Sequence, residues 1–282
     1  MTIKHFMAED IATLLPQRKN DTHKGDYGKV MLLCGSKGYT GAAALAALGA
    51  LRSGAGLVYL GVPESIYEIE AIKLLEPIVF SLPDRGGIYD LSACDTIETM
   101  FPKMDAVLVG PGIGKSEGSL SVVRTVLEKF EGPVVLDADG INVLSAHKYI
   151  LRDRIAPTII TPHDGEFVRI GGVISSDRTE SAATLAKELG CIVLLKGHHT
   201  VITDGNVCYI NQTGNPGMAV GGSGDVLSGI IVSLLGQGLS PLLAAACGAW
   251  LHGAAGDLCA KEIGQYGMLP QDMLCVLPRL LP

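Results

Sequence analysis

The sequence lacks the charge pattern and targeting features of several protein classes. Its formal net charge is −7, and a chain without an excess of Lys and Arg has little attraction for a phosphate backbone. We therefore expect no nucleic-acid partner. The first ten residues contain no apolar core of a secretory signal and already carry acidic side chains, which predicts a cytoplasmic protein.

The cysteines do not form the pattern of a disulfide framework or a zinc site. The chain has seven of them, an odd number, and no C-x-x-C pair. Most lie in apolar runs such as residues 30–34, where a thiol behaves as a small hydrophobe in a reducing compartment. We therefore expect neither disulfides nor bound zinc.

Long uninterrupted apolar segments are also missing. The two most apolar stretches, residues 41–60 and 218–235, are rich in glycine and are interrupted by Arg52 and Asp225 respectively. A membrane-spanning helix needs about 20 predominantly apolar residues, so these stretches are typical of core helices and turns. We expect no membrane partner.

Two common nucleotide-binding fingerprints are absent. No G-x-G-x-x-G occurs, so dinucleotide binding in the Rossmann manner has no support. The segment Gly110-Pro-Gly-Ile-Gly-Lys-Ser116 resembles a phosphate-binding P-loop, but its required first glycine would fall on Val109. The spacing therefore fails, and any nucleotide site has to be built from other residues.

The chain does contain enough apolar material for a large core. Its 282 residues are 48% hydrophobic and 18% charged. α/β folds commonly use ~250 residues as one unit, and no linker, repeat or low-complexity tract divides the chain. We predict a single domain spanning residues 1–282.

Short apolar runs alternate with longer helical patterns along most of the chain. The expected strands are residues 29–34, 56–61, 105–109, 133–137, 158–161, 191–196, 200–204 and 207–211. The expected helices are residues 40–53, 117–130, 165–170, 178–190, 222–235, 241–263 and 270–281. Such alternation predicts a three-layer α/β fold, with helices on both faces of a mainly parallel sheet. Ligands of such sheets bind beyond the carboxyl ends of the strands.

The most informative segment is Asn215-Pro-Gly-Met-Ala-Val-Gly-Gly-Ser-Gly-Asp225, which precedes an apolar helical run. Its glycines permit a tight turn and present N–H groups at a helix start, where the macrodipole favours anions. We predict an anion hole made of Gly221, Gly222, Ser223 and Gly224, with Asp225 beside it as the general base. The alternative at this point is an N-capping Asp in a glycine-rich loop.

The Gly-Gly-Ser-Gly-Asp225 segment resembles the anion-hole motif of ribokinase-like kinases, in which the terminal Asp activates an acceptor hydroxyl. Further segments narrow the resemblance to the NAD(P)H-hydrate dehydratases: His23-Lys-Gly-Asp-Tyr-Gly28, Gly35-Ser with Tyr39-Thr-Gly-Ala-Ala43, Arg52-Ser-Gly-Ala-Gly56, Gly110-Pro-Gly-Ile-Gly114, Leu136-Asp-Ala-Asp139, Thr161-Pro-His-Asp-Gly-Glu166, Leu195-Lys-Gly-His-His-Thr200 and Leu251-His-Gly253. The resemblance implies a ribokinase-like three-layer αβα sandwich. Because the sequence contains no counterpart of the epimerase domain of larger members, we expect dehydratase activity alone.

The reaction of that family gives these residues a chemistry. The S-epimer of NADH hydrate or NADPH hydrate carries a hydroxyl that leaves poorly. Phosphoryl transfer from ADP or ATP converts it to a phosphate ester, which the lone pair of the ring nitrogen helps to expel. Positioning and charge stabilisation suffice for such a transfer. The resemblance implies ADP or ATP as co-substrate, together with Mg²⁺ to neutralise phosphate charge, and it leaves open which nucleotide and which hydrate are preferred.

The resemblance also assigns binding residues. The nucleotide would contact Lys196, Gly197, His198, His199, Thr200 and Gly224, with residues 211–215 contributing. The substrate would contact Ala42, Gly112, His163 and Asp225. Each assignment has a structural alternative: a solvated strand end for Lys196, a surface loop position for His163, and tight helix–sheet packing for the two small residues.

Three acidic side chains near these positions have open roles. Glu166 either helps to organise Mg²⁺ or is a favourable acid in a first helical turn. Asp137 and Asp139 follow a predicted strand and either bind a metal or, as we favour, shape a turn.

Two other functions remain possible for this sequence, and the resemblance also implies an oligomeric state. A kinase of the same fold would phosphorylate a vitamin precursor or a sugar with the same base. A nucleotide-sensing or scaffold protein would bind adenine nucleotide without turnover. Members of the resembled family form homotetramers, so a tetramer is the expected oligomer.

Overall fold

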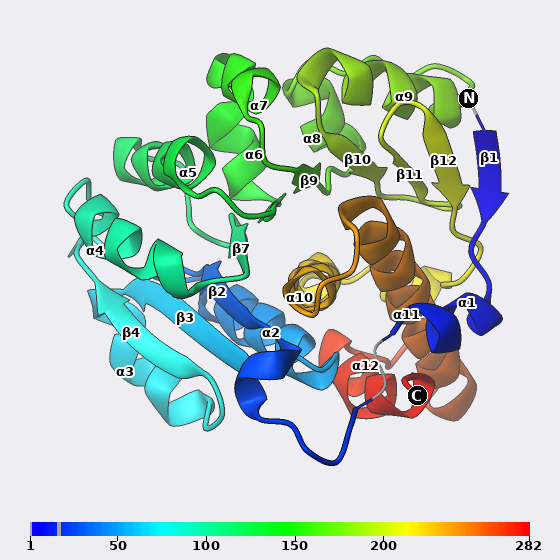
Figure 1. The fold of residues 1–282 in the computed structure, drawn as a ribbon, viewed down its shortest axis with the longest axis horizontal. Helices are drawn as coiled ribbons and strands as arrows, with labels where there is room; N and C mark the ends of the chain where they lie inside the picture. Colours follow the sequence, from blue (N-terminus) through cyan, green and yellow to red (C-terminus); the bar gives the residue numbers. More distant parts are fainter. Residues whose placement is uncertain (1, 16–17) are drawn as a thin grey trace.

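The computed structural model describes residues 2–15 and 18–282, apart from the side chain of residue 8. Ten strands form one sheet in the order β1-β12-β11-β10-β9-β8-β7-β2-β3-β4 (Figure 1). Their bounds are β1 Thr2–His5, β2 Lys29–Leu33, β3 Leu57–Pro63, β4 Ile78–Leu82, β7 Ala106–Val109, β8 Val134–Leu136, β9 Thr158–Ile160, β10 Ile192–Leu195, β11 Val201–Thr203 and β12 Val207–Ile210. Neighbours are parallel except where β11 meets β10 and β12. The predicted mainly parallel sheet is confirmed.

Successive residues of the strands face opposite sides of the sheet. On β2, Val30 and Leu32 belong to one buried cluster, whereas Met31 and Leu33 belong to another. The first cluster is covered by α1 Ala8–Leu14, α2 Thr40–Arg52, α3 Glu64–Lys73, α10 Ser223–Gly236, α11 Pro241–Glu262 and α12 Pro270–Val276. The second is covered by α4 Ala93–Met100, α5 Glu117–Lys129, α6 Asp139–Leu144, α7 Tyr149–Asp153, α8 Asp164–Arg169 and α9 Arg178–Leu189. A core on each face confirms the three-layer arrangement.

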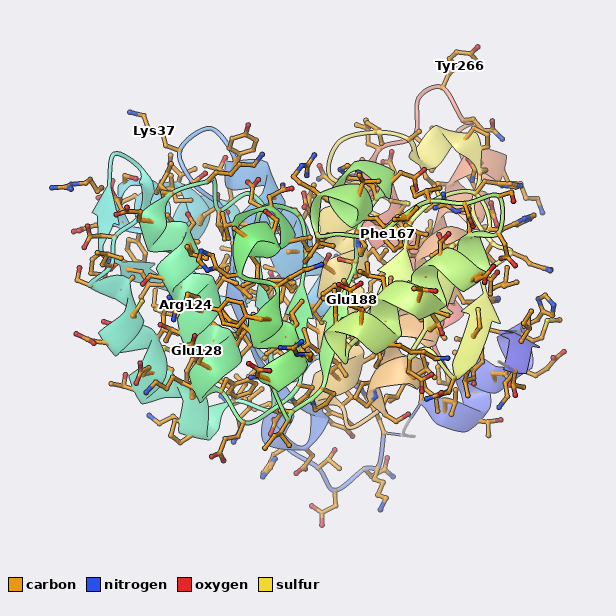
Figure 2. All side chains as sticks on the ribbon, turned by 90° about the horizontal axis from the view of Figure 1, so that it is seen from above. Lys37, Arg124, Glu128, Phe167, Glu188 and Tyr266 are labelled. Atoms are coloured by element: carbon orange, nitrogen blue, oxygen red, sulfur yellow. The ribbon has the colours of Figure 1, made fainter. Side chains whose placement is uncertain are left out.

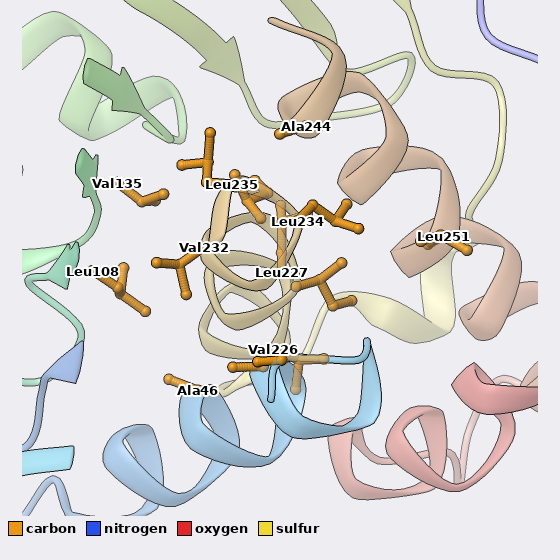
Figure 3. Packing of buried hydrophobic residues seen from close by; sticks show 14 of the residues in the cluster. Ala46, Leu108, Val135, Val226, Leu227, Val232, Leu234, Leu235, Ala244 and Leu251 are labelled. Atoms are coloured by element: carbon orange, nitrogen blue, oxygen red, sulfur yellow. The ribbon is translucent and has the colours of Figure 1, made fainter. Parts of the chain in front are cut away.

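Helix α10 lies at the centre of the first core, surrounded by side chains of the sheet, α2 and α11 (Figure 3). It is buried from Val226 to Leu235. A Cβ on Gly229 would lie 2.1 Å from the carbonyl oxygen of Ala46 on α2, so only glycine permits this approach of the two backbones. This packing fixes α10 against the sheet, with its first turn near the carboxyl ends of the central strands.

The outer helices separate polar and apolar faces. On α5, Arg124 and Glu128 form an exposed ion pair of 3.0 Å (Figure 2), while Val122 and Val126 are buried against the sheet. This is the pattern of an amphipathic surface helix. All seven cysteines are free thiols, and five of them are buried, as expected of small apolar side chains.

Several elements were not expected from the sequence. They are β1, β4, the short hairpin of β5 Asp84–Arg85 and β6 Ile88–Tyr89, and helices α1, α3, α4, α6 and α7. β1 and β4 are the edges of the sheet, where exposure weakens the apolar pattern of a strand. The expected helix 270–281 ends at Val276 and continues as a 3-10 turn, because Pro278 lacks an N–H and restricts the residue before it.

Helix α11 passes a length and composition test for a membrane span, and it does so alone among the described helices. Within its 18-residue apolar window, 67% of the residues are buried inside the protein. Ala245, Cys247 and Leu251 of this helix belong to the same core as α10. Core packing therefore accounts for the apolar character of α11.

Candidate active site

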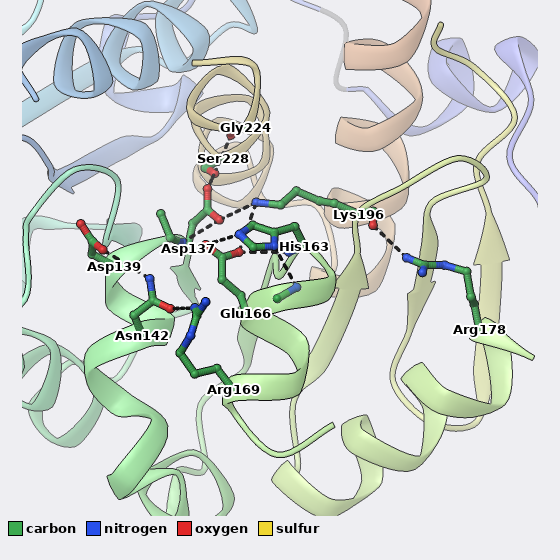
Figure 4. Close-up of polar contacts among 12 residues, drawn as sticks. Asp137, Asp139, Asn142, His163, Glu166, Arg169, Arg178, Lys196, Gly224 and Ser228 are labelled. Atoms are coloured by element: carbon green, nitrogen blue, oxygen red, sulfur yellow. Dashed lines mark hydrogen bonds and ion pairs between the residues drawn. The ribbon is translucent and has the colours of Figure 1, made fainter. Parts of the chain in front are cut away.

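Polar side chains from four elements meet beyond the carboxyl ends of the strands (Figure 4). Asp137 follows β8, Glu166 lies on α8 just after β9, Lys196 follows β10, and Ser228 lies on α10. Parallel strands bring their carboxyl ends to one edge of the sheet. The fold thus joins segments that lie far apart in the sequence.

The start of α10 presents backbone N–H groups without internal partners. Gly222 adopts a φ of 96°, which glycine tolerates better than other residues. Among the described residues, the amides of Gly221, Gly222, Gly224 and Asp225 have no acceptor, whereas the amide of Ser223 donates to the Val220 carbonyl at 3.3 Å. The free amides are suited to an anion. Of the four residues expected to form the anion hole, Ser223 is therefore the one whose amide is engaged.

Asp225 lies in the first turn of α10, next to these amides. Burial is the largest cause that raises its pKa from 3.8 to about 7, and the negative charge of Asp137 adds to it. Lys196 opposes this shift, and Glu166 supports it. A carboxylate with a pKa near neutrality is matched to general-base chemistry at physiological pH. The electrostatics of this position therefore fit a base better than a simple helix cap.

Asp137 connects the sheet to α10. Its side chain is 1% exposed, and its Oδ1 lies 3.0 Å from Lys196 Nζ. Oδ1 also accepts a hydrogen bond of 2.8 Å from the Ala138 amide, and Oδ2 accepts one from the Ser228 hydroxyl. The carboxylate shapes the local turn, as favoured from the sequence, and in addition forms a buried ion pair that was not foreseen.

Lys196 is not a solvated strand end. Its side chain is 22% exposed, and its Nζ lies 3.8 Å from Glu166 Oε2 in addition to the contact with Asp137. Burial alone would lower the pKa of Lys196, but the charges of Asp137 and Glu166 raise it. A Cβ built on Gly224 would lie 3.5 Å from Lys196 Nζ. The cation therefore lies beside the free amides of α10.

His163 and Glu166 cap helix α8 through a capping box. The Glu166 carboxylate accepts from the His163 amide at 3.0 Å, and His163 Nδ1 accepts from the Gly165 amide at 3.0 Å. His163 Nε2 lies 3.4 Å from Glu166 Oε1. The His163 side chain is 56% exposed and that of Glu166 is 6% exposed. His163 is therefore accessible to a ligand, and Glu166 has the first-turn position expected of it.

The described residues contain no group of three or more His, Cys, Asp or Glu side chains placed to hold a metal ion. Mg²⁺ that accompanies a nucleotide takes most of its ligands from phosphate oxygens and water, with one or two carboxylates. Glu166 Oε1 lies 3.4 Å from His163 Nε2, whereas the contacts with Lys196 Nζ and with the His163 amide are made by Oε2. One carboxylate oxygen therefore fits such an ion.

A cavity of about 860 Å³ opens beside the start of α10. Its lining includes all the residues expected to bind nucleotide, namely Lys196, Gly197, His198, His199, Thr200 and Gly224, and also His163. The loop of residues 211–216 forms another wall. The cavity thus brings together the β10–β11 loop, the loop after β12 and the first turn of α10.

Ala42 and Gly112 lie together but outside the lining of this cavity, as does Asp225. A Cβ on Gly112, whose φ is 65°, would lie 2.9 Å from Ala42 Cβ. Helix α2, which carries Ala42, packs against α10, and Leu45 contacts Gly222. The expected substrate residues therefore form two groups: the pair on the α2 side of α10, and His163 on the cavity side.

Sequence reasoning missed Ser228 altogether, and it did not foresee the ion pair of Asp137 with Lys196 or a role for the buried His252 of α11. A signal existed for Asp137, because it and Lys196 both follow predicted parallel strands. None existed for Ser228, which lies inside an apolar helical run, whereas His252 lay within the quoted Leu251-His-Gly253 segment and was given no role.

The comparisons with known proteins agree with this geometry. The family model described as NAD(P)H-hydrate dehydratase matches residues 30–279. The chain belongs to the NAD(P)H-hydrate dehydratase family. An ADP-dependent (S)-NAD(P)H-hydrate dehydratase of Bacillus subtilis is 36% identical over 290 residues, covering 99% of this chain and 98% of the relative. The predicted family is confirmed.

Other dehydratase relatives are longer. A bifunctional NAD(P)H-hydrate repair enzyme of Moorella thermoacetica is 45% identical over 274 residues, which cover 95% of this chain and 52% of the relative. The chain spans about half the length of the first curated relatives it matches.

Solved structures give the same result for the fold. The ADP/ATP-dependent NAD(P)H-hydrate dehydratase of Bacillus subtilis, co-crystallised with ATP and Mg²⁺, superposes with a TM-score of 0.85 at 32% identity, covering 99% of this chain and 98% of that chain. Arabidopsis thaliana ribokinase superposes with a TM-score of 0.59 at 16% identity, covering 90% and 98%. The ribokinase-like fold predicted for this dehydratase family member is confirmed.

Proposed function

We propose that this chain consumes ADP or ATP to dehydrate the S-epimer of NADH hydrate or NADPH hydrate, and so regenerates NADH or NADPH. Membership of the NAD(P)H-hydrate dehydratase family supports the activity, because the Bacillus subtilis relative with that printed activity matches along nearly its whole length. The observation that carries the proposal is the geometry at the start of α10. There, free amides adjoin Lys196 and a carboxyl group whose pKa is about 7.

The chain's residues account for each part of the transfer. The substrate hydroxyl attacks the terminal phosphoryl group of the nucleotide while Asp225 takes the hydroxyl proton. The bond to the departing AMP, or ADP, breaks as free amides and Lys196 stabilise the phosphoryl oxygens. The ring nitrogen lone pair then expels phosphate as the carbon–oxygen bond breaks. Loss of a proton from the neighbouring carbon restores the ring double bond.

The binding roles follow the two groups of residues. The cavity formed by Lys196–Thr200, Gly224 and the 211–216 loop holds the nucleotide. Ala42 and Gly112 contact the hydrated dinucleotide, and His163 contacts it from the cavity side. Asp225, in the first turn of α10, is the base that takes the proton of the hydroxyl.

Mg²⁺ belongs to this proposal as the companion of the nucleotide. When bound, it supplies charge neutralisation for the phosphates. Glu166 is the residue that would hold it, directly or through water, because Lys196 and the His163 amide contact the other oxygen of this carboxylate, Oε2. Lys196 shares its charge with Asp137 and Glu166, so it stabilises the phosphoryl oxygens only in part and the phosphates need this additional cation.

The cellular setting is also a proposal. We place the protein in the cytoplasm, as one domain over residues 1–282 that assembles into a homotetramer. The free thiols support a reducing compartment. Light scattering after gel filtration would test the assembly, and a stable monomer would contradict it.

The decisive experiment supplies purified protein with the S-epimer of NADH hydrate and ADP, then with ATP. The expected result is recovery of the reduced-nicotinamide absorbance, with one nucleotide consumed for each NADH formed. No recovery, together with phosphorylation of a vitamin precursor or sugar, would replace the dehydratase with a kinase. Nucleotide binding without any turnover would indicate a nucleotide-sensing or scaffold protein.

A further inference from the structure

His252 is a buried histidine of α11 to which the proposed reaction gives no role. It is 8% exposed and lines the nucleotide cavity, as do Ser223 and Gly224. Its Nε2 lies 3.3 Å from Ser223 Oγ, so the two side chains share a hydrogen bond. This contact links α11 to the first residue of α10. Burying a histidine costs folding free energy unless its ring nitrogens form hydrogen bonds.

The imidazole of His252 is neutral at physiological pH. Its pKa is lowered to about 4, mainly by burial and in smaller part by the positive charge of Lys196. A hydrogen bond with the backbone of Ser223 acts in the opposite direction. A neutral imidazole has one N–H donor and one acceptor nitrogen. His252 therefore adds no cation beside the phosphates but still has a proton to donate.

Ser223 cannot contribute to the anion hole in the same way as its neighbours. Its amide donates to the Val220 carbonyl, whereas the amides of Gly222, Gly224 and Asp225 have no acceptor among the described residues. Its hydroxyl, however, belongs to a residue that lines the cavity next to Gly224. A hydroxyl has one proton and two acceptor lone pairs. If His252 Nε2–H donates to Oγ, the hydroxyl proton is left for another acceptor.

We propose that His252 is a positioning residue that turns the Ser223 hydroxyl into a further donor of the anion hole. The neutral imidazole donates from Nε2 to Ser223 Oγ, and the Ser223 O–H donates to an oxygen of the transferred phosphoryl group. The Ser223 amide is not available to the phosphate because it donates to the Val220 carbonyl. The Ser223 hydroxyl supplies a donor in its place. The reverse arrangement would point an oxygen lone pair at the phosphate. This inference rests on the proposed phosphoryl transfer.

The test compares Ser223→Ala, His252→Leu, the double variant and His252→Gln with the wild type. Loss of one preorganised donor lowers kcat, here by about 10²- to 10³-fold for Ser223→Ala, with the KM for ADP changed by less than about threefold. His252→Leu should give a similar loss. The double variant should be no slower than Ser223→Ala, because both changes remove one donor. His252→Gln should recover most of kcat, since its amide nitrogen takes the place of Nε2.

Wild-type kcat in Ser223→Ala would overturn the proposal, even if His252→Leu did not fold. Losses that multiply in the double variant would also overturn it, because His252 would then act independently of Ser223. A recovery of kcat by His252→Asn equal to that by His252→Gln would contradict the Nε2 assignment, since the Asn nitrogen takes the place of Nδ1.

A second measurement separates this inference from the proposed function. Affinity for AMP with Mg²⁺ and aluminium fluoride, a mimic of the phosphoryl group in transfer, should fall about tenfold or more in Ser223→Ala and in His252→Leu. That result in a protein inactive on NADH hydrate would refute the dehydratase function and support the donor. An active wild type whose Ser223→Ala variant binds the mimic unchanged would support the function and refute the donor.

Discussion

Lys196 Nζ lies 3.0 Å from Asp137 Oδ1, and this ion pair joins the carboxyl ends of β10 and β8 across the intervening strand β9. The Asp137 side chain is 1% exposed, and its second oxygen accepts a hydrogen bond from Ser228 of α10. The sheet, the β10–β11 loop and the first turns of α10 are thereby linked through one carboxylate. Removing either charge would leave the other buried and poorly paired.

Asp137→Asn is expected to destabilise the protein. Breaking a buried pair costs about 3–5 kcal/mol, and we expect about 2–4 kcal/mol here because the Lys196 side chain keeps 22% exposure. Urea unfolding at pH 7 measures the change. Asp153→Asn is the control, since its contact with Arg152 is 3.5 Å long and exposed, and surface pairs contribute little. Equal urea unfolding midpoints for the two variants would show that the ion pair of Asp137 with Lys196 does not stabilise the fold.

Asp225→Asn is expected to abolish turnover while leaving the nucleotide site intact. The amide cannot accept the hydroxyl proton, and loss of a general base lowers kcat by about 10²–10⁴-fold. The Kd for ADP, measured by calorimetry, should stay within about threefold of the wild type, since Asp225 does not line the cavity. Wild-type turnover in this variant would remove the base assignment.

The activity should depend on pH through the same carboxyl group. Its pKa is raised from 3.8 to about 7, mainly by burial, and only the ionised form can act as a base. We therefore expect kcat/KM to fall about tenfold per pH unit below pH 7 and to level off above it. Steady-state rates between pH 5 and 9 measure this profile. A profile that stays flat down to pH 5 would contradict the raised pKa.

The raised pKa of Asp225 also predicts that the carboxylate needed for catalysis lowers the stability of the fold. Because the folded-state pKa exceeds the unfolded value, ionisation is penalised in the fold, and stability is lost as pH rises from about 4 through about 7. Asp225→Asn should therefore be more stable than the wild type at pH 8, by about 1–4 kcal/mol. The gain should vanish near pH 4. Denaturant unfolding at both pH values would show this, and an equal gain at both would implicate another cause.

Gly222→Ala should strain the turn that precedes α10. The φ of Gly222 is 96°, and a side chain in the left-handed region costs about 1–2 kcal/mol. The added Cβ would also lie 2.5 Å from the flexible end of Leu45. Gly221→Ala is the matched stability control, because its Cβ would meet nothing within 4 Å. Similar unfolding midpoints for the two variants would argue against a strained turn.

Much of the fold was predictable because local patterns carry it. The buried central strands are continuous apolar runs, and β2, β7, β8, β9 and β10 lie within one or two residues of their expected bounds. The edge strand β1 escaped prediction, since all four of its residues are exposed and its pairing with β12 depends on a contact distant in sequence. The residues that the resemblance assigned to the nucleotide lie around one cavity.

By itself the sequence determined the alternation of strands and helices, the glycine-rich turn before α10 and the family. These depend on residue periodicity and on backbone freedom at particular positions, both of which are local. Only the tertiary structure decided the charges of the site. The pairing of Asp137 with Lys196, the raised pKa of Asp225 and the neutral state of His252 arise from burial and from neighbours on other elements. Electrostatic energy depends on distance in space and on solvent exclusion, and a linear pattern encodes neither.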